Sequence, residues 1–134
     1  MDSNYTYQYG FGKTVTGPFD SVVTKVINAL QKEGFGVLSD IDVAATLKKK
    51  LNLESPPYRI LGACNPTLAH RGLEIEPSLG LLLPCNVVVR VDDKDMVHVE
   101  IMDPNIISTL INKPEIYELS VEAKKRLERV INDL

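Results

Sequence analysis

Apolar residues recur every three or four positions between residues 18 and 34, the spacing that gathers side chains on one face of an α-helix. Pro18 suits the first turn of such a helix, and Gly34 can supply the left-handed residue that ends it. The pattern therefore predicts a long amphipathic helix. Its inner face is expected to contain Phe19, Val22, Val23, Val26, Ile27 and Leu30.

Four more helices are predicted from residues that cap helix N-termini. Asp42 and Asn65 each precede an apolar pattern with helical spacing, and Pro66 takes the first helical position after Asn65. Asp103 is likewise followed by a proline, and Ser120 is expected to cap the last helix. The residues expected on inner faces are Val43, Leu47, Leu51, Leu68, Ala69, Leu73, Ala123, Leu127, Val130, Ile131 and Leu134.

Extended segments are indicated by short apolar runs and by strict alternation. Residues 35–38 and 58–63 predict two short strands, and residues 81–91 predict a strand that is buried for most of its length. Aromatic residues at every second position predict a single N-terminal strand. The residues on its one aromatic face are Tyr5, Tyr7, Tyr9 and Phe11.

The last two predicted strands form a hairpin. The register that keeps the apolar residues on one face pairs Val89 with Val99 and leaves a loop of three residues between the strands. The same register places Arg90 opposite His98 and diagonal to Glu100. These polar side chains are therefore expected on the outer face of the hairpin.

The order of these elements is β-α-β-α-β-α-β-β-α-α, which predicts an α+β fold: a curved, largely antiparallel sheet with helices packed on one side. The chain has 134 residues, of which 44% are hydrophobic, enough for one ordinary core. Neither a linker nor a repeat interrupts it, so residues 1–134 are interpreted as a single domain.

The formal net charge of −3 argues against a nucleic-acid-binding protein, because such proteins carry a basic surplus on one face. No apolar run approaches the ~20 residues that a membrane span needs. The first ten residues are polar and lack the apolar segment of a signal peptide. We therefore expect a cytoplasmic protein without a nucleic-acid or membrane partner.

Cys64 is the sharpest candidate for chemistry, because it lies between a predicted strand and the helix that Asn65 caps. Amide dipoles at a helix N-terminus lower the pKa of a nearby thiol, as reactive cysteines require. The alternative is that Cys64 packs as a small apolar residue. Cys85, at the mouth of a hydrophobic strand, fits core packing better. A redox pair of Cys64 and Cys85 requires their Cα atoms to lie within about 7 Å, and the sequence leaves open whether the two strand ends meet.

His70 lies toward the rim of the helix that begins at Pro66. With Cys64 and Cys85 it offers three ligands for an open zinc or copper site, but the spacing matches no standard metal motif. Phosphate-binding loops, nucleophile elbows and paired carboxylates on one helix face are also missing from the sequence. No catalytic residue is assigned, no cofactor is indicated, and whether the chain is an enzyme stays open.

The blocks "PPYRILGACNPTLAHRGLE" and "PSLGLLLPCNVVVRV" resemble those of the family catalogued as domain of unknown function 302, over nearly the whole chain. The resemblance implies a small α+β domain with a sheet of the TATA-binding-protein type, a homodimer, and no assigned biochemical role. It also places Cys64, Asn65 and Pro66 in the family's Cys-Asn-Pro block, and Cys85 in its Leu-Pro-Cys block.

Three hypotheses follow. The first is a non-catalytic homodimeric module that binds a small molecule or a metal ion, in a pocket lined by Tyr7 with its neighbouring tyrosines and by the turn at Cys64 and Asn65. The second is a thiol-dependent protein that uses Cys64 with His70 or Cys85. The third is an accessory subunit whose interaction surface is its function.

Overall fold

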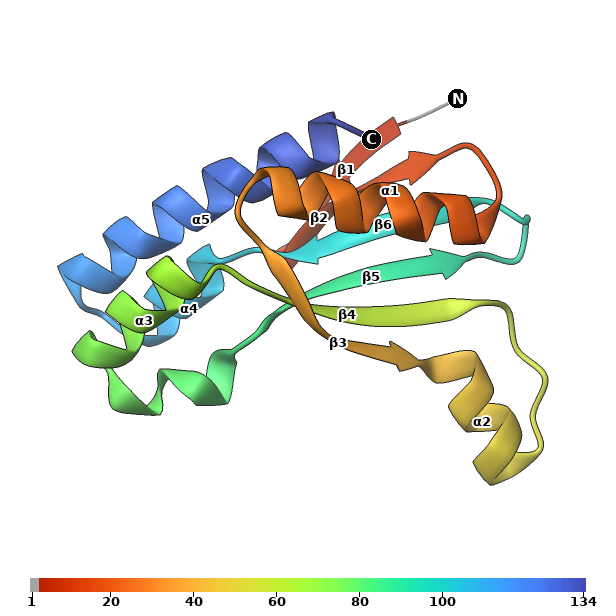
Figure 1. Cartoon of the computed structure of the whole chain (residues 1–134), viewed down its shortest axis with the longest axis horizontal. Helices are drawn as coiled ribbons and strands as arrows, with labels where there is room; N and C mark the ends of the chain where they lie inside the picture. The colour runs from red at the N-terminus through yellow and green to blue at the C-terminus, as the bar shows by residue number, and fades with distance from the viewer. Residues whose placement is uncertain (1–2) are drawn as a thin grey trace.

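One six-stranded antiparallel sheet organises the computed structural model, which describes residues 3–134 (Figure 1). The strands lie in the order β1-β2-β6-β5-β4-β3, so β1 and β3 form the edges. Each neighbouring pair runs antiparallel. Their bounds are β1 Ser3–Thr6, β2 Gly10–Val15, β3 Gly36–Asp42, β4 Tyr58–Cys64, β5 Cys85–Val91 and β6 Val97–Met102.

The helices are distributed unevenly around this sheet. The bounds are α1 Phe19–Lys32, α2 Val43–Leu51, α3 Pro66–Ile75, the 3-10 helix η1 Pro77–Leu82, α4 Asn105–Leu110 and α5 Pro114–Asn132. Helices α1 and α5 lie over the sheet, α3, η1 and α4 gather at one end of it, and α2 projects beyond the opposite end (Figure 1). Within residues 3–134, none of the helices has both the length and the apolar composition that crossing a bilayer demands.

The main core lies between the sheet and the helices α1 and α5. Alternate residues of the central strands enter it because side chains of a strand point to opposite faces in turn. Val87, Val89 and Val99 are fully buried there, as are Leu30 of α1 and Leu127 of α5. A second, smaller cluster joins α3, η1, α4 and the first half of α5 through Leu79, Ile107, Ile116 and Leu119.

Helix ends and the hairpin register follow the sequence pattern closely. Asp42 accepts a hydrogen bond from the amide of Ala45 at 2.8 Å, and Asn65 accepts one from the amide of Leu68 at 3.0 Å, so two of the four predicted caps are confirmed. Asp103 was wrongly expected to cap α4, whose cap residue is Pro104. Gly34, with φ of 83°, ends α1. The pairing of Val89 with Val99, Val91 with Val97 and Arg90 with His98 is confirmed as well.

The predicted N-terminal strand is wrong, because the chain reverses within it. The amide of Tyr7 donates to the carbonyl of Gly10 at 2.6 Å, and this turn separates β1 from β2. Tyr5 then lies opposite Gly12, so its side chain points to the face opposite that of Phe11. The alternation of aromatic residues continues through a turn and does not mark one continuous strand.

Three further expectations are corrected. Ser120 does not cap the last helix: α5 begins at Pro114, and the Ser120 hydroxyl is buried and donates to the carbonyl of Ile116. Residues 81–83 belong to η1 and the following loop, with Leu81 87% exposed, so the strand begins only at Cys85. Helix α2 contains no buried residue, although an inner face was expected for it, because it projects from the sheet.

Candidate functional site

One face of the sheet carries no helix layer, and its side chains form the candidate site. The register sets one row of residues across all six strands on this face. Its members, from edge to edge, are Ile41, Ile60, Val88, Glu100, Gly12 and Tyr5. The row is apolar on the β3 side and polar on the β1 side, so the uncovered face has two chemically distinct halves.

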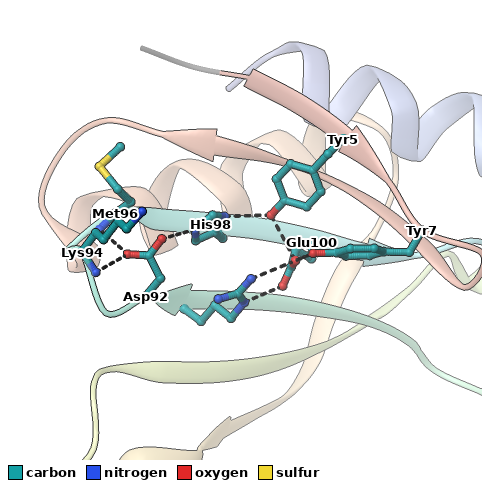
Figure 2. A network of polar contacts seen from close by, with 8 residues as sticks. Tyr5, Tyr7, Asp92, Lys94, Met96, His98 and Glu100 are labelled. Carbon is teal, nitrogen blue, oxygen red and sulfur yellow. Dashed lines mark hydrogen bonds and ion pairs between the residues drawn. The ribbon is translucent and has the colours of Figure 1, made fainter.

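Glu100 is the centre of the polar half (Figure 2). Its carboxylate accepts hydrogen bonds from Arg90 Nε at 2.8 Å and Arg90 Nη2 at 3.3 Å. The hydroxyls of Tyr5 and Tyr7 each donate to Glu100 Oε2 at 3.0 Å. A forked pair between a guanidinium and a carboxylate is the strong, directional form of this interaction. Glu100 therefore joins β5 and β6 to the N-terminal strand.

These contacts change the acidity of the groups. Burial alone would raise the pKa of Glu100, but the hydrogen bonds from Arg90, Tyr7 and Tyr5 outweigh it and hold the pKa below its ordinary value. The hydrogen bond to Glu100 raises the pKa of Arg90 and that of Tyr7. Burial, followed by the charge of Glu100, raises the pKa of Tyr5. The charged forms of Arg90 and Glu100 and the neutral forms of both tyrosines are thus stabilised together.

His98 extends this network toward the hairpin loop. Its Nδ1 lies 2.9 Å from the Tyr5 hydroxyl, and its Nε2 lies 2.7 Å from Asp92 Oδ2. The other oxygen of Asp92 accepts from the amides of Lys94 and Met96. The hydrogen bond from His98, followed by these amides, lowers the pKa of Asp92 to about 2.

Counting hydrogens defines the state in which this chain of contacts is complete. The links Asp92–His98, His98–Tyr5 and Tyr5–Glu100 each need one hydrogen. With both carboxylates ionised, Tyr5 supplies one hydrogen and a neutral imidazole supplies only one more. All three links therefore coexist only when His98 carries hydrogens on both ring nitrogens. In that state the charged groups of this hydrogen-bonded chain, Asp92, His98, Glu100 and Arg90, alternate in sign.

The tyrosines of the N-terminal segment stack beside this network. The ring centroids of Tyr5 and Tyr7 lie 5.5 Å apart, and those of Tyr7 and Tyr9 lie 5.4 Å apart with planes inclined by only 15°. Tyr9 ends the ladder and is 66% exposed. Gly12 gives room to the side chain of Glu100, because a Cβ there would lie 2.9 Å from Glu100 Cγ and 2.5 Å from the carbonyl oxygen of Val99.

A cleft of about 580 Å³ lies in the uncovered face, where the tyrosine ladder meets the sheet. Tyr9 and Tyr58 contribute aromatic rings, Arg90 and Glu100 contribute charge, and Asn86 contributes an amide. The remaining lining is Tyr7, Gly10, Val88, Ile101, Met102 and Ile106. Its volume and its mixture of aromatic walls with a few polar groups are those of a small-molecule site.

Tyr7 therefore lies in a cleft, as predicted, but Cys64 and Asn65 do not share it. Cys64, Asn65 and Cys85 line a separate apolar cavity of about 70 Å³ beneath α3 and α5. Cys85 pairs with Ala63, the residue before Cys64, so the two strand ends that carry the thiols do meet. The single pocket of tyrosines and Cys-Asn-Pro turn that we expected is wrong, because these elements lie on different faces of the sheet.

The geometry contradicts a lowered thiol pKa. Burial raises the pKa of Cys64, and burial together with the neighbouring Cys64 raises the pKa of Cys85 to about 11. Both cysteines are free thiols. Desolvation in the apolar cavity therefore favours the thiol forms of both cysteines.

His70 lies apart from the cysteines. Its side chain is 75% exposed and its Nε2 lies 3.2 Å from Glu74 Oε1 one turn along α3. The expected metal set of Cys64, His70 and Cys85 is therefore not assembled. Among residues 3–134, no three histidine, cysteine or acidic side chains are grouped so that they could hold a metal ion.

Sequence reasoning found the polar pairs of the hairpin but not Tyr58 or Asn86 as parts of a site. Tyr58 pairs with Arg90 across β4 and β5, and this contact depends on the order of the strands in the sheet. The signal that was available was the hairpin register, which already set Arg90 beside His98 and Glu100. Extending that register to the neighbouring strands requires the topology.

Fold and site together define an α+β protein whose helices cover one sheet face and leave a tyrosine-lined cleft on the other. The chain belongs to the family described as Domain of unknown function DUF302, which matches residues 11–134. It is similar to the crystal structure of an uncharacterized conserved DUF302 protein from Bacillus stearothermophilus. That likeness has a TM-score of 0.87 at 27% identity and covers 95% of this chain and 98% of that chain. Among curated proteins, none matches this chain.

The lowered pKa values of Asp92 and Glu100 predict a loss of stability in acid. An unfolded chain titrates these carboxyls near pH 4, so between about pH 4 and pH 2 it binds more protons than the folded protein does. The free energy of unfolding should therefore fall as the pH is lowered through this window. Urea titrations at several pH values would measure it, and Asp92→Asn should flatten the dependence. Asp93→Asn in the same loop is the control, and an equal flattening by both variants would contradict the assignment.

The raised pKa values predict slow thiol chemistry. At pH 7, iodoacetamide should alkylate Cys64 more slowly than it alkylates a free thiol, and Cys85 more slowly still, because both thiolates are disfavoured. Mass spectrometry of a labelling time course would follow each site. The urea-unfolded chain is the control, in which both cysteines should react alike. Faster reaction of Cys64 in the folded protein would revive the thiol-dependent hypothesis.

Proposed function

We propose that this protein is a non-catalytic binding module that holds a small molecule in the cleft of the uncovered sheet face. The observation that carries the proposal is the cleft itself: Tyr7, Tyr9 and Tyr58 border a floor on which Arg90 and Glu100 are held in a forked pair. Sites with fixed polar groups and aromatic walls bind ligands without reorganisation.

The state of the polar groups supports binding over catalysis. Glu100 accepts from both tyrosine hydroxyls and from Arg90. Proton-transfer catalysis needs a group whose pKa lies near the working pH. Here the hydrogen bonds lower the pKa of Glu100 and raise the pKa of Tyr7, and burial followed by the charge of Glu100 raises the pKa of Tyr5. Each of these pKa values moves away from neutrality. The network is suited to holding a fixed shape.

This function predicts which backbone amides change their chemical shifts when a ligand binds. In an amide-resolved NMR screen of a fragment library, the shifts of bound fragments should concentrate at Gly10, Asn86 and Met102, which line the cleft. Tyr9→Leu should weaken these responses severalfold, because it removes an exposed wall. Tyr117→Leu is the matched control, because Tyr117 on α5 is also exposed, at 57%. Responses at the Cys64–Cys85 cavity instead, or at no site, would contradict the proposal.

We further propose that the chain forms a homodimer through a surface on β3 and α2. This β3–α2 surface is defined by Leu38, Ile41, Leu51 and Leu53, which are 72%, 50%, 62% and 51% exposed. Large apolar side chains exposed on neighbouring elements are typical of interaction sites. A two-fold interface contacts its own copy and must be self-complementary. Asp42 and the lysines at 48–50 belong to the same segment and carry opposite charges, which supports pairing of this surface with a second copy.

The dimer proposal predicts a mass change. In size-exclusion chromatography with light scattering, the wild-type protein should have twice the 14.9 kDa of one chain. Leu51→Glu should weaken the dimer about 30-fold or more and shift the mass toward one chain, because it places a charge in an apolar contact. Leu81→Glu on η1, where the side chain is 87% exposed, is the matched control. A monomeric wild-type protein across the accessible concentrations would refute the dimer.

A further inference from the structure

The aromatic end of the cleft is a stack of tyrosine rings whose last member, Tyr9, is exposed. Tyr5, Tyr7 and Tyr9 form a ladder, and the last step, between Tyr7 and Tyr9, is nearly parallel. The backbone under this end is anchored, since the Tyr7 amide donates to Gly10 at 2.6 Å and the Asp103 amide donates to the Tyr9 carbonyl at 3.0 Å. One ring face of Tyr9 rests on Tyr7 while the residue as a whole is 66% exposed. The next position in the ladder is shaped for a planar group.

The polar end of the cleft offers donors and few acceptors. Arg90 uses Nε and one hydrogen of Nη2 for Glu100, and a guanidinium has five N–H groups. Arg90 also forms a hydrogen bond with the hydroxyl of Tyr7, which leaves two of its five N–H groups for a ligand. Glu100 Oε2 already accepts from Tyr5, Tyr7 and Arg90. A ligand that reaches this end finds unused N–H groups, while the carboxylate is occupied.

We infer that the ligand is a planar aromatic molecule that carries a hydrogen-bond acceptor, a carboxylate or a carbonyl, at its edge, with its ring stacked on Tyr9 and its acceptor bound by Arg90. This inference rests on the proposed function and specifies the ligand of the same cleft. Both residues line that cleft, which makes one ligand able to meet them together. An amine at the same edge meets donors and an already occupied carboxylate.

Three probes of similar size separate the elements of this inference. The probe 2-naphthoate has a planar ring and a carboxylate, 2-naphthylmethylammonium has the same ring with a cationic donor, and decanoate has the carboxylate without a ring. Isothermal titration calorimetry would measure their affinities, and amide NMR shifts would locate them. We expect 2-naphthoate to bind more than tenfold more tightly than the ammonium probe, because only it accepts from Arg90. It should also bind about three- to tenfold more tightly than decanoate.

Variants of Tyr9 test the stacking contact. Tyr9→Leu should weaken 2-naphthoate about three- to tenfold and leave decanoate unchanged. Tyr9→Phe keeps the ring and should restore the affinity for 2-naphthoate. Tyr9 lies in an exposed turn, so these changes leave the core intact, and Tyr117→Leu on α5 is the control that should change neither probe.

The outcomes separate this inference from the function beneath it. Equal or tighter binding of the ammonium probe in the cleft would overturn the acceptor, and equal effects of Tyr9→Leu on both carboxylates would overturn the stack. In both cases binding in the cleft would stand. Fragments of other chemistry that shift the cleft amides while 2-naphthoate does not would refute the ligand class alone. If no probe or fragment shifts the amides of the cleft, both the proposed function and this inference are refuted.

Discussion

The carboxylate of Glu100 is the contact on which the uncovered face depends. It lies on β6, accepts the guanidinium of Arg90 from β5, and accepts the hydroxyls of Tyr5 and Tyr7 from the N-terminal segment. A carboxylate removed from water needs such partners, since an unpaired buried charge is costly. The same four hydrogen bonds that satisfy the charge also hold the tyrosine ladder against the sheet.

Much of the fold could be predicted from local pattern. The hairpin register followed from keeping valines on one face, and the caps at Asp42 and Asn65 followed from residue type and position. The N-terminal segment could not be predicted in this way. Its alternating tyrosines continue through a turn at Gly10, where a Cβ would lie 2.8 Å from the carbonyl oxygen of Ile101 on a strand about ninety residues away. That constraint is tertiary and leaves no local trace.

The site was less predictable than the fold for a related reason. Cysteines and histidines are the distinctive candidates for chemistry in a sequence, and Cys64 lies where a helix N-terminus favours a thiolate. The surroundings decided otherwise, because the apolar cavity raises the pKa of Cys64. Tyr58, Asn86 and Arg90 are ordinary residues when read along the chain, and only strand order brings them to one cleft.

Strand β5 contributes side chains both to the core and to the floor of the cleft, whereas the rim of the cleft lies outside the core. Val87 and Val89 pack in the core while Val88 and Arg90, their immediate neighbours, form the floor of the cleft. Because its residues alternate with closely packed core residues on the same strand, the floor is rigid. The rim at Tyr9 is exposed and borders a turn, so substitutions there cost the fold little. A domain built in this way can exchange residues at the rim while the floor and the core keep the same stability.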